Sequence, residues 1–94
     1  MIVQDGDCLR LSGELTLSTV SGLLEAGRAA VAAGDCVADL SAVTRVDSAA
    51  LALLFAWLRA ARSAGHRLSL VNAPTALVSL ASLYDVDGLL PPAA

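Results

Sequence analysis

Apolar positions along the chain fall into short runs and helical repeats, separated by glycine and polar residues. Residues 2–4 and 8–12 are two such runs, and Asp5-Gly6-Asp7 lies between them. A short turn that contains Asp-Gly between two apolar runs is typical of a β-hairpin. We therefore expect two paired strands at the start of the chain.

A helix is predicted next, because apolar residues between Val20 and Val31 recur near helical spacing. Ser18 and Thr19 precede this segment and are candidates for its N-cap. Gly34 follows it, and a glycine at this place is a common helix stop. The first third of the chain thus predicts two strands followed by one helix.

The rest of the chain continues the alternation of strand and helix. Residues 36–40 form a short apolar run, which is typical of a central strand buried on both faces. Asp47 and Ser48 then open a long, almost wholly apolar helix that reaches about Ala64. Residues 68–71 predict a further strand, and a third helix follows it.

This order of elements predicts an α/β fold. The first two strands pair as a hairpin, and crossover helices join the later strands in parallel, so we expect a mixed sheet of about four strands. Three to four helices should cover this sheet. A chain of 94 residues suits one domain, over residues 1–94. We expect a tail with Val86, Leu89 and Leu90, followed by prolines, to fold over the core.

Composition and charge exclude several classes of protein. The chain is 56% hydrophobic and 3% aromatic, so its core must consist mainly of Ala, Leu and Val. The net charge is -3, and the six basic residues are scattered arginines, which argues against nucleic acid as a partner. The apolar run of residues 49–58 is too short to span a bilayer, and the N-terminus lacks the pattern of a signal peptide. We expect a cytoplasmic protein without direct membrane insertion.

Residues with catalytic or metal-binding chemistry are few and dispersed. The chain has one His, two Cys and nine acidic residues, and they form no local cluster. We therefore expect no enzyme activity, no metal site and no cofactor. His66 is interpreted as a solvated turn residue, and Cys8 and Cys36 as small buried hydrophobic residues in two strands.

The junction at Asp47 and Ser48 is the most informative position in the chain. Both residue types cap helices, so either can satisfy the free N–H groups at the helix start. The same N–H groups and the helix dipole also favour an oxygen acceptor or an anion beside Ser48. A phosphoryl group on Ser48 would gain from the helix end but would be repelled by Asp47, and the sequence leaves this balance open.

The long helix has two apolar sides. The side expected to face the sheet carries large residues, namely Leu51, Leu54, Phe55 and Leu58. A neighbouring arc, which continues to Ser48, carries mainly small residues, namely Ala49, Ala52, Leu53 and Ala56. Either another helix covers this arc, or its small side chains let a partner protein approach closely. Trp57 lies at the edge of the first side, as a core residue or an interface anchor.

Three segments together resemble those of STAS domains. They are Leu11-Ser12-Gly13-Glu14-Leu15, Asp39-Leu40-Ser41 with Val43, and Val46-Asp47-Ser48 with Leu51. This family includes anti-sigma factor antagonists, cytoplasmic domains of sulfate transporters, and a small cytoplasmic subunit of an ABC transporter that maintains outer-membrane lipid asymmetry. The downstream half, above all Leu83-Tyr84-Asp85-Val86-Asp87-Gly88-Leu89-Leu90-Pro91, is most similar to the transporter subunit.

The resemblance implies a role for Ser48, because this residue matches the hydroxyl residue at the start of the second STAS helix. Transporter subunits place that residue near the ATPase subunit, and antagonists offer it to a partner kinase. The family also often has glycine just after it, whereas this chain has Ala49 and Ala50, whose methyl groups slightly crowd a partner.

We therefore expect a non-enzymatic STAS subunit that binds the cytoplasmic ATPase subunit of an ABC transporter, in a complex with a permease, and supports phospholipid transport. It would be peripheral at the inner membrane through these partners. The expected contact residues are Asp47, Ser48, Ala49, Ala52, Leu53 and Ala56. The alternative is an anti-sigma factor antagonist that an anti-sigma factor kinase switches by phosphorylation of Ser48.

Overall fold

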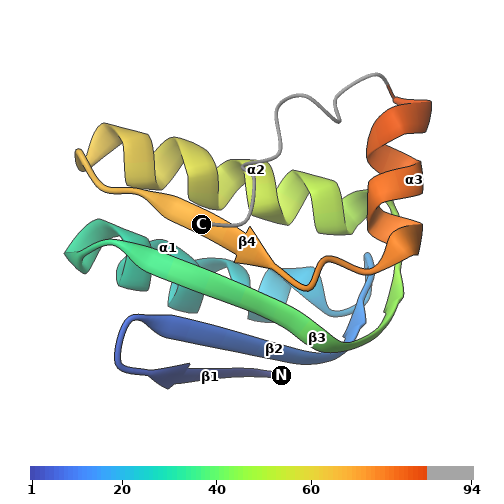
Figure 1. Cartoon of the computed structure of the whole chain (residues 1–94), viewed down its shortest axis with the longest axis horizontal. Coiled ribbons are helices and arrows are strands. Elements are labelled where there is room, and N and C mark those ends of the chain that lie inside the picture. The colour runs from blue at the N-terminus through green and yellow to red at the C-terminus, as the bar shows by residue number, and fades with distance from the viewer. Residues whose placement is uncertain (85–94) are drawn as a thin grey trace.

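The computed structural model describes residues 1–84, and these contain a mixed sheet of four strands (Figure 1). The strands are β1 (Ile2–Asp5), β2 (Cys8–Leu15), β3 (Cys36–Val46) and β4 (Leu68–Val71), and they lie in the order β1-β2-β3-β4. β1 is antiparallel to β2, as the predicted hairpin requires, and Gly6 at the turn has a φ of 63°. The β2–β3 and β3–β4 pairs are parallel.

Helices join the parallel strands and cover one face of the sheet (Figure 1). A short 3-10 helix, η1 (Val20–Gly22), precedes α1 (Leu24–Ala33), and α2 (Ser48–Ser63) follows β3. α3 (Thr75–Leu83) stands at the end of the sheet where the parallel strands end. The predicted α/β fold, with a four-stranded mixed sheet and three helices, is confirmed.

The loop after β2 differs from the prediction, because neither candidate cap opens the helix. The Thr19 hydroxyl donates to the Glu14 carbonyl oxygen (2.8 Å) and accepts from the Thr16 backbone N–H (3.0 Å). These bonds use the hydroxyl within the turn, and Thr19 makes no side-chain cap bond to η1. The prediction that Ser18 or Thr19 caps the helix is therefore wrong, and α1 begins at Leu24.

Strand β3 is longer and less buried than predicted. It extends to Val46, because Leu15 at the end of β2 still pairs with that residue. Cys36, Ala38 and Leu40 are buried beneath the helices, whereas the alternate residues on the other face are half-buried. The prediction of a strand buried on both faces is wrong, because α1 and α2 cover one face of the sheet.

Trp57 lies in the centre of the interface between α1 and α2 and is fully buried, with 0% of its surface exposed. Its Nε1 donates to the Leu24 carbonyl oxygen (3.0 Å), so the indole N–H is satisfied. A Cβ atom at Gly27 of α1 would overlap the Trp57 ring, so glycine lets the ring fit against α1. Trp57 is therefore a core residue.

The buried side of α2 is rotated relative to the prediction. Leu51 and Leu54 are buried as expected, but Phe55 and Leu58 are only half-buried. The buried positions instead centre on Trp57: Ala50, Leu51, Leu53, Leu54, Trp57 and Ala61. The large indole fixes which arc of α2 turns inward.

Three further predictions concern residues away from α2. His66 is half-buried, and its Nδ1 lies 2.9 Å from the Val31 carbonyl oxygen near the end of α1, so it is not the solvated turn residue predicted. Cys36 is buried, Cys8 is half-buried, and both are free thiols. The predicted tail with Val86, Leu89 and Leu90 lies outside the described residues.

Candidate functional site

The candidate site lies where β2 and β3 end and α2 begins. Leu15 and Val46 are the last paired residues of these two strands, and the Asp47 backbone N–H donates to the Leu15 carbonyl oxygen (3.2 Å). The carboxyl ends of neighbouring parallel strands are where α/β folds commonly place functional loops. The loop of residues 16–19 and the first turn of α2 therefore form one surface.

Asp47 joins the two parts of this surface. Its backbone is extended, and its Oδ1 accepts from the Ala49 backbone N–H (2.8 Å), which makes Asp47 the N-cap of α2. Its Oδ2 accepts from the backbone N–H of Leu17 (3.0 Å) in loop 16–19. Of the two candidate caps, Asp47 performs the capping, and Ser48 is the first residue of the helix.

Ser48 is exposed at the first position of α2. With Leu51, Phe55 and Tyr84 it lines an open hollow of about 310 Å³ between α2 and the end of α3. Because Asp47 already provides the cap, Ser48 is not needed for that purpose, and the residue borders an accessible space. This geometry suits contact with another protein or modification of the hydroxyl.

The arc of small residues on α2 borders a second hollow, which we call the apolar hollow. It has a volume of about 370 Å³ and lies between η1 and α2, and its lining is almost wholly apolar: Leu17, Val20, Ser21, Leu24, Ala49, Ala52, Leu53 and Ala56. Residues of η1 and α1 thus flank the arc without filling the space beside it. The arc is therefore flanked by neighbouring elements but not covered by them.

The predicted contact residues differ in how accessible they are. Ala52 is exposed, and Ala49 and Ala56 are half-buried. Leu53 lines the apolar hollow but is only 3% exposed. The prediction that Leu53 is accessible on the arc is therefore wrong. The role of these residues in binding a partner stays a prediction.

Leu17 is a member of this surface that sequence reasoning missed. It is 79% exposed, although it is a large apolar residue, and it lines the apolar hollow opposite α2. The sequence around it, Thr16-Leu17-Ser18-Thr19, has no helical or strand periodicity that would mark its position. The one feature of the sequence that could have indicated an exposed Leu17 is that it is a single apolar residue among hydroxyl residues.

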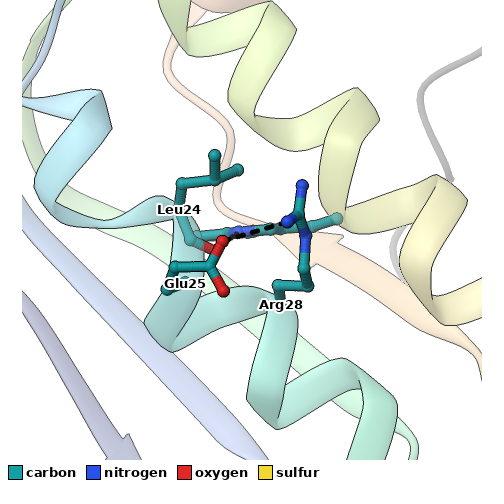
Figure 2. A network of polar contacts seen from close by, with 4 residues as sticks. Leu24, Glu25 and Arg28 are labelled. Atoms are coloured by element: carbon teal, nitrogen blue, oxygen red, sulfur yellow. Dashed lines mark hydrogen bonds and ion pairs between the residues drawn. The ribbon is translucent and has the colours of Figure 1, made fainter.

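Charged side chains lie near two residues of the apolar hollow, Leu17 and Leu24. Glu14 and Arg45 pair in register on β2 and β3 and line a polar hollow of about 250 Å³ together with Asp47. On the α1 side, Figure 2 shows Glu25 and Arg28 next to Leu24, with Arg28 Nη1 3.0 Å from Glu25 Oε1. Leu17, which lines both hollows, and Leu24, which precedes Glu25, are the residues of the apolar hollow that lie close to charged groups.

Titratable groups with displaced pKa values lie on the sheet, away from this surface. Burial, with the nearby charges of Asp7 and Asp35, raises the pKa of the Cys36 thiol and keeps it protonated. Hydrogen bonds from the Ser41 backbone N–H and the Asn72 side chain lower the pKa of Asp39. Neither group contributes to the candidate site.

Residues 1–84 contain neither a metal-binding cluster nor a helix that could span a membrane. Within this range no group of three or more His, Cys, Asp or Glu side chains is arranged to hold a metal ion. No helix in the same range has the length and apolar character that crossing a membrane requires.

Solved structures of two anti-sigma factor antagonists, one of them putative, share this arrangement. SpoIIAA, an anti-sigma factor antagonist in its unphosphorylated form, superposes with a TM-score of 0.75 at 15% identity, covering 100% of this chain and 87% of SpoIIAA. A putative anti-sigma factor antagonist from Thermotoga maritima gives a TM-score of 0.78 at 19% identity, covering 100% of this chain and 85% of that protein. At these identities the likeness defines the fold, which is that of a STAS domain.

Sequence comparison identifies the family within the STAS domains to which the chain belongs. The family model described as "Mlab, STAS domain" matches residues 2–91. The intermembrane phospholipid transport system binding protein MlaB of Escherichia coli K12 is 38% identical over 84 residues, which cover 89% of this chain and 86% of that protein. MlaB of Shigella flexneri gives the same values. The chain belongs to the MlaB family of STAS domains, which confirms the resemblance predicted from the sequence.

Proposed function

We propose that the protein is a non-enzymatic STAS subunit of an Mla-type ABC transporter. It binds the cytoplasmic ATPase subunit, an MlaF-like protein, within a complex with a permease, and supports the assembly or activity of this complex. The transporter moves phospholipid and maintains the lipid asymmetry of the outer membrane. Support comes from the identity of 38% to two proteins named as binding proteins of an intermembrane phospholipid transport system.

One observation in the structure carries the proposal, namely the open apolar hollow beside the exposed start of α2. We call Ser48, Ala49, Ala52 and Ala56, together with the apolar hollow, the docking surface. Small side chains let a partner backbone approach closely, and a concave apolar patch with a polar rim is typical of protein interfaces. In this proposal the chain is cytoplasmic and is held at the inner membrane by its partners.

Charged substitutions at the docking surface test the proposal. Ser48→Arg and Ala52→Arg each place a long cation against the partner, and we expect both variants to lose binding to the purified ATPase–permease complex. Ala29→Arg is a matched control, because Ala29 is an exposed residue on α1 that does not line the hollow. All three variants should melt like the wild type, and undiminished binding by both docking-surface variants would refute the docking model.

A second function follows from the exposure of Ser48. Because Asp47 caps α2, the Ser48 hydroxyl is available to a kinase, as an anti-sigma factor antagonist requires. Incubation with the cognate kinase and ATP should then add one phosphate, detected by intact mass, and Ser48→Ala should add none. An unchanged mass of the wild type would eliminate this function.

Partners recovered from the native host decide between the two functions. An ABC ATPase purified together with its permease supports the transporter subunit, whereas a small kinase without a transporter supports the antagonist.

A further inference from the structure

We propose that Leu17 is the hydrophobic anchor of the docking surface, and that the ATPase subunit presents a recess for its isobutyl group and an apolar side chain that enters the apolar hollow. This inference rests on the proposed function, because it names the chemistry by which the same surface holds the same partner. It adds loop 16–19 to an interface that the sequence places on α2 alone.

The accessible side chains of the docking surface on α2 are small. A standard interface buries roughly 800 Å² from each partner, and its binding energy is concentrated in a few large side chains. The accessible α2 residues of the docking surface are a serine and three alanines, and Leu53 beneath them is only 3% exposed. The interface must therefore extend beyond α2, to an element that supplies a larger group.

Loop 16–19 is the extension that the structure offers. Among residues 1–84 the exposed large hydrophobic residues are Met1, Val3, Leu17, Val78, Leu83 and Tyr84. Of these, Leu17 is the one that lines the apolar hollow. A partner that covers Ala49 and Ala52 therefore meets Leu17 across the hollow without crossing any other element.

Loop 16–19 is also held in place before any partner arrives. The Leu17 backbone N–H donates to Asp47 Oδ2 (3.0 Å), and the Thr19 hydroxyl donates to the Glu14 carbonyl oxygen (2.8 Å). The Thr16 backbone N–H donates to the same hydroxyl (3.0 Å). An anchor on a loop that is already ordered binds more tightly, because little conformational entropy is lost on docking.

The polar hollow adds a requirement of charge. Glu14, Arg45 and Asp47 line the polar hollow together with Leu17, which also lines the apolar hollow. A partner whose recess accepts Leu17 comes close to Glu14 and Arg45, so we expect it to carry a base opposite Glu14 and an acid opposite Arg45. These charges orient the partner and contribute less to affinity than the apolar anchor does.

Truncation of the anchor tests the inference. Leu17→Ala should weaken binding to the purified ATPase–permease complex by about tenfold or more, mainly through faster dissociation. Leu83→Ala is the matched control, because Leu83 is the same residue type and is 76% exposed, and it should change the affinity by less than about twofold. Surface plasmon resonance gives both rates, and thermal melting verifies that the fold of each variant is retained.

The outcomes separate this inference from the proposed function. If Ala52→Arg abolishes binding and Leu17→Ala leaves the affinity unchanged, the anchor is refuted and the docking model stands. If the wild type binds and neither variant weakens it, the partner uses another surface and both proposals are wrong. If the wild type does not bind the complex, the proposed function is refuted, and so is the inference that rests on it.

Discussion

The two sides of α2 differ in the size and burial of their side chains. The inner side carries large residues, and Trp57 fills the space that Gly27 leaves on α1. The outer side begins with the exposed Ser48 and continues with alanines that border an open hollow. The difference indicates that the inner side stabilises the helix, while the outer side contributes little to the core and is accessible. The substitutions below test this division.

The largest effect is expected for Trp57→Ala. The change removes a fully buried indole and its hydrogen bond to Leu24, so the free energy of unfolding should fall by about 3–5 kcal/mol. That is a large part of the roughly 5–15 kcal/mol typical of a small domain. Denaturant unfolding followed by circular dichroism measures it, and Trp57→Phe, which keeps an aromatic ring, should show a smaller loss. A loss below about 1 kcal/mol would mean that the inner side does not dominate.

Gly27→Ala is expected to have the next largest effect. The added methyl overlaps the Trp57 ring, and overpacking of this kind costs about 1–3 kcal/mol, partly offset by the better helix propensity of alanine. Unfolding can be followed by the fluorescence of Trp57, which is the single tryptophan of the chain. Gly22→Ala is the control, because its added methyl meets nothing within 4 Å. Equal stability of the two variants would contradict the close packing of α1 on Trp57.

Asp47→Ala should have an intermediate effect at the boundary between the two sides. It removes the N-cap of α2 and leaves the Leu17 N–H without its acceptor, which together should cost about 1–2 kcal/mol. Asp47→Asn keeps a carbonyl oxygen and should retain part of this energy. Urea unfolding of both variants provides the measurement, and an unchanged Asp47→Ala midpoint would show that the cap is dispensable.

Ser48→Ala should have the smallest effect. Ser48 is exposed and is not the cap, so the free energy of unfolding should change by less than about 0.5 kcal/mol. The same urea experiment applies, with Asp47→Ala as the internal comparison. If Ser48→Ala proved as damaging as Asp47→Ala, the outer side would have a structural role that the hydrogen bonds do not show.

Local signals in the sequence were sufficient for the hairpin, for β4 and for the start of α2. Each depends on residues close together in the chain, such as Asp5-Gly6-Asp7 or the pair Asp47 and Ser48. The inward side of α2 was predicted less well, because helical periodicity gives the relative directions of side chains but not the arc that turns inward. That arc depends on the fit between Trp57 and Gly27, which lie on different helices.

The candidate site was predicted only in part, for a similar reason. Its position at Ser48 followed from cap chemistry and from the STAS resemblance. Asp47 is the cap through a local bond from the Ala49 N–H, which sequence alone did not distinguish from capping by Ser48. The second bond of Asp47, from the Leu17 N–H, joins segments far apart in sequence, and no local pattern predicts it. Leu17 has no periodic neighbours, so its place beside the hollow was visible only in three dimensions.

The order of the strands has a consequence for how the protein forms. Each strand pairs with the one that precedes it in the chain, since Cys8 lies opposite Asp5, Val37 opposite Cys8, and Leu68 opposite Cys36. No later strand has to be inserted between two earlier ones. Because synthesis delivers the N-terminal segments first, the sheet can grow from β1 to β4 as the chain leaves the ribosome, with each strand added to an existing edge. A STAS domain of this topology can thus form its sheet strand by strand, in the order of the chain.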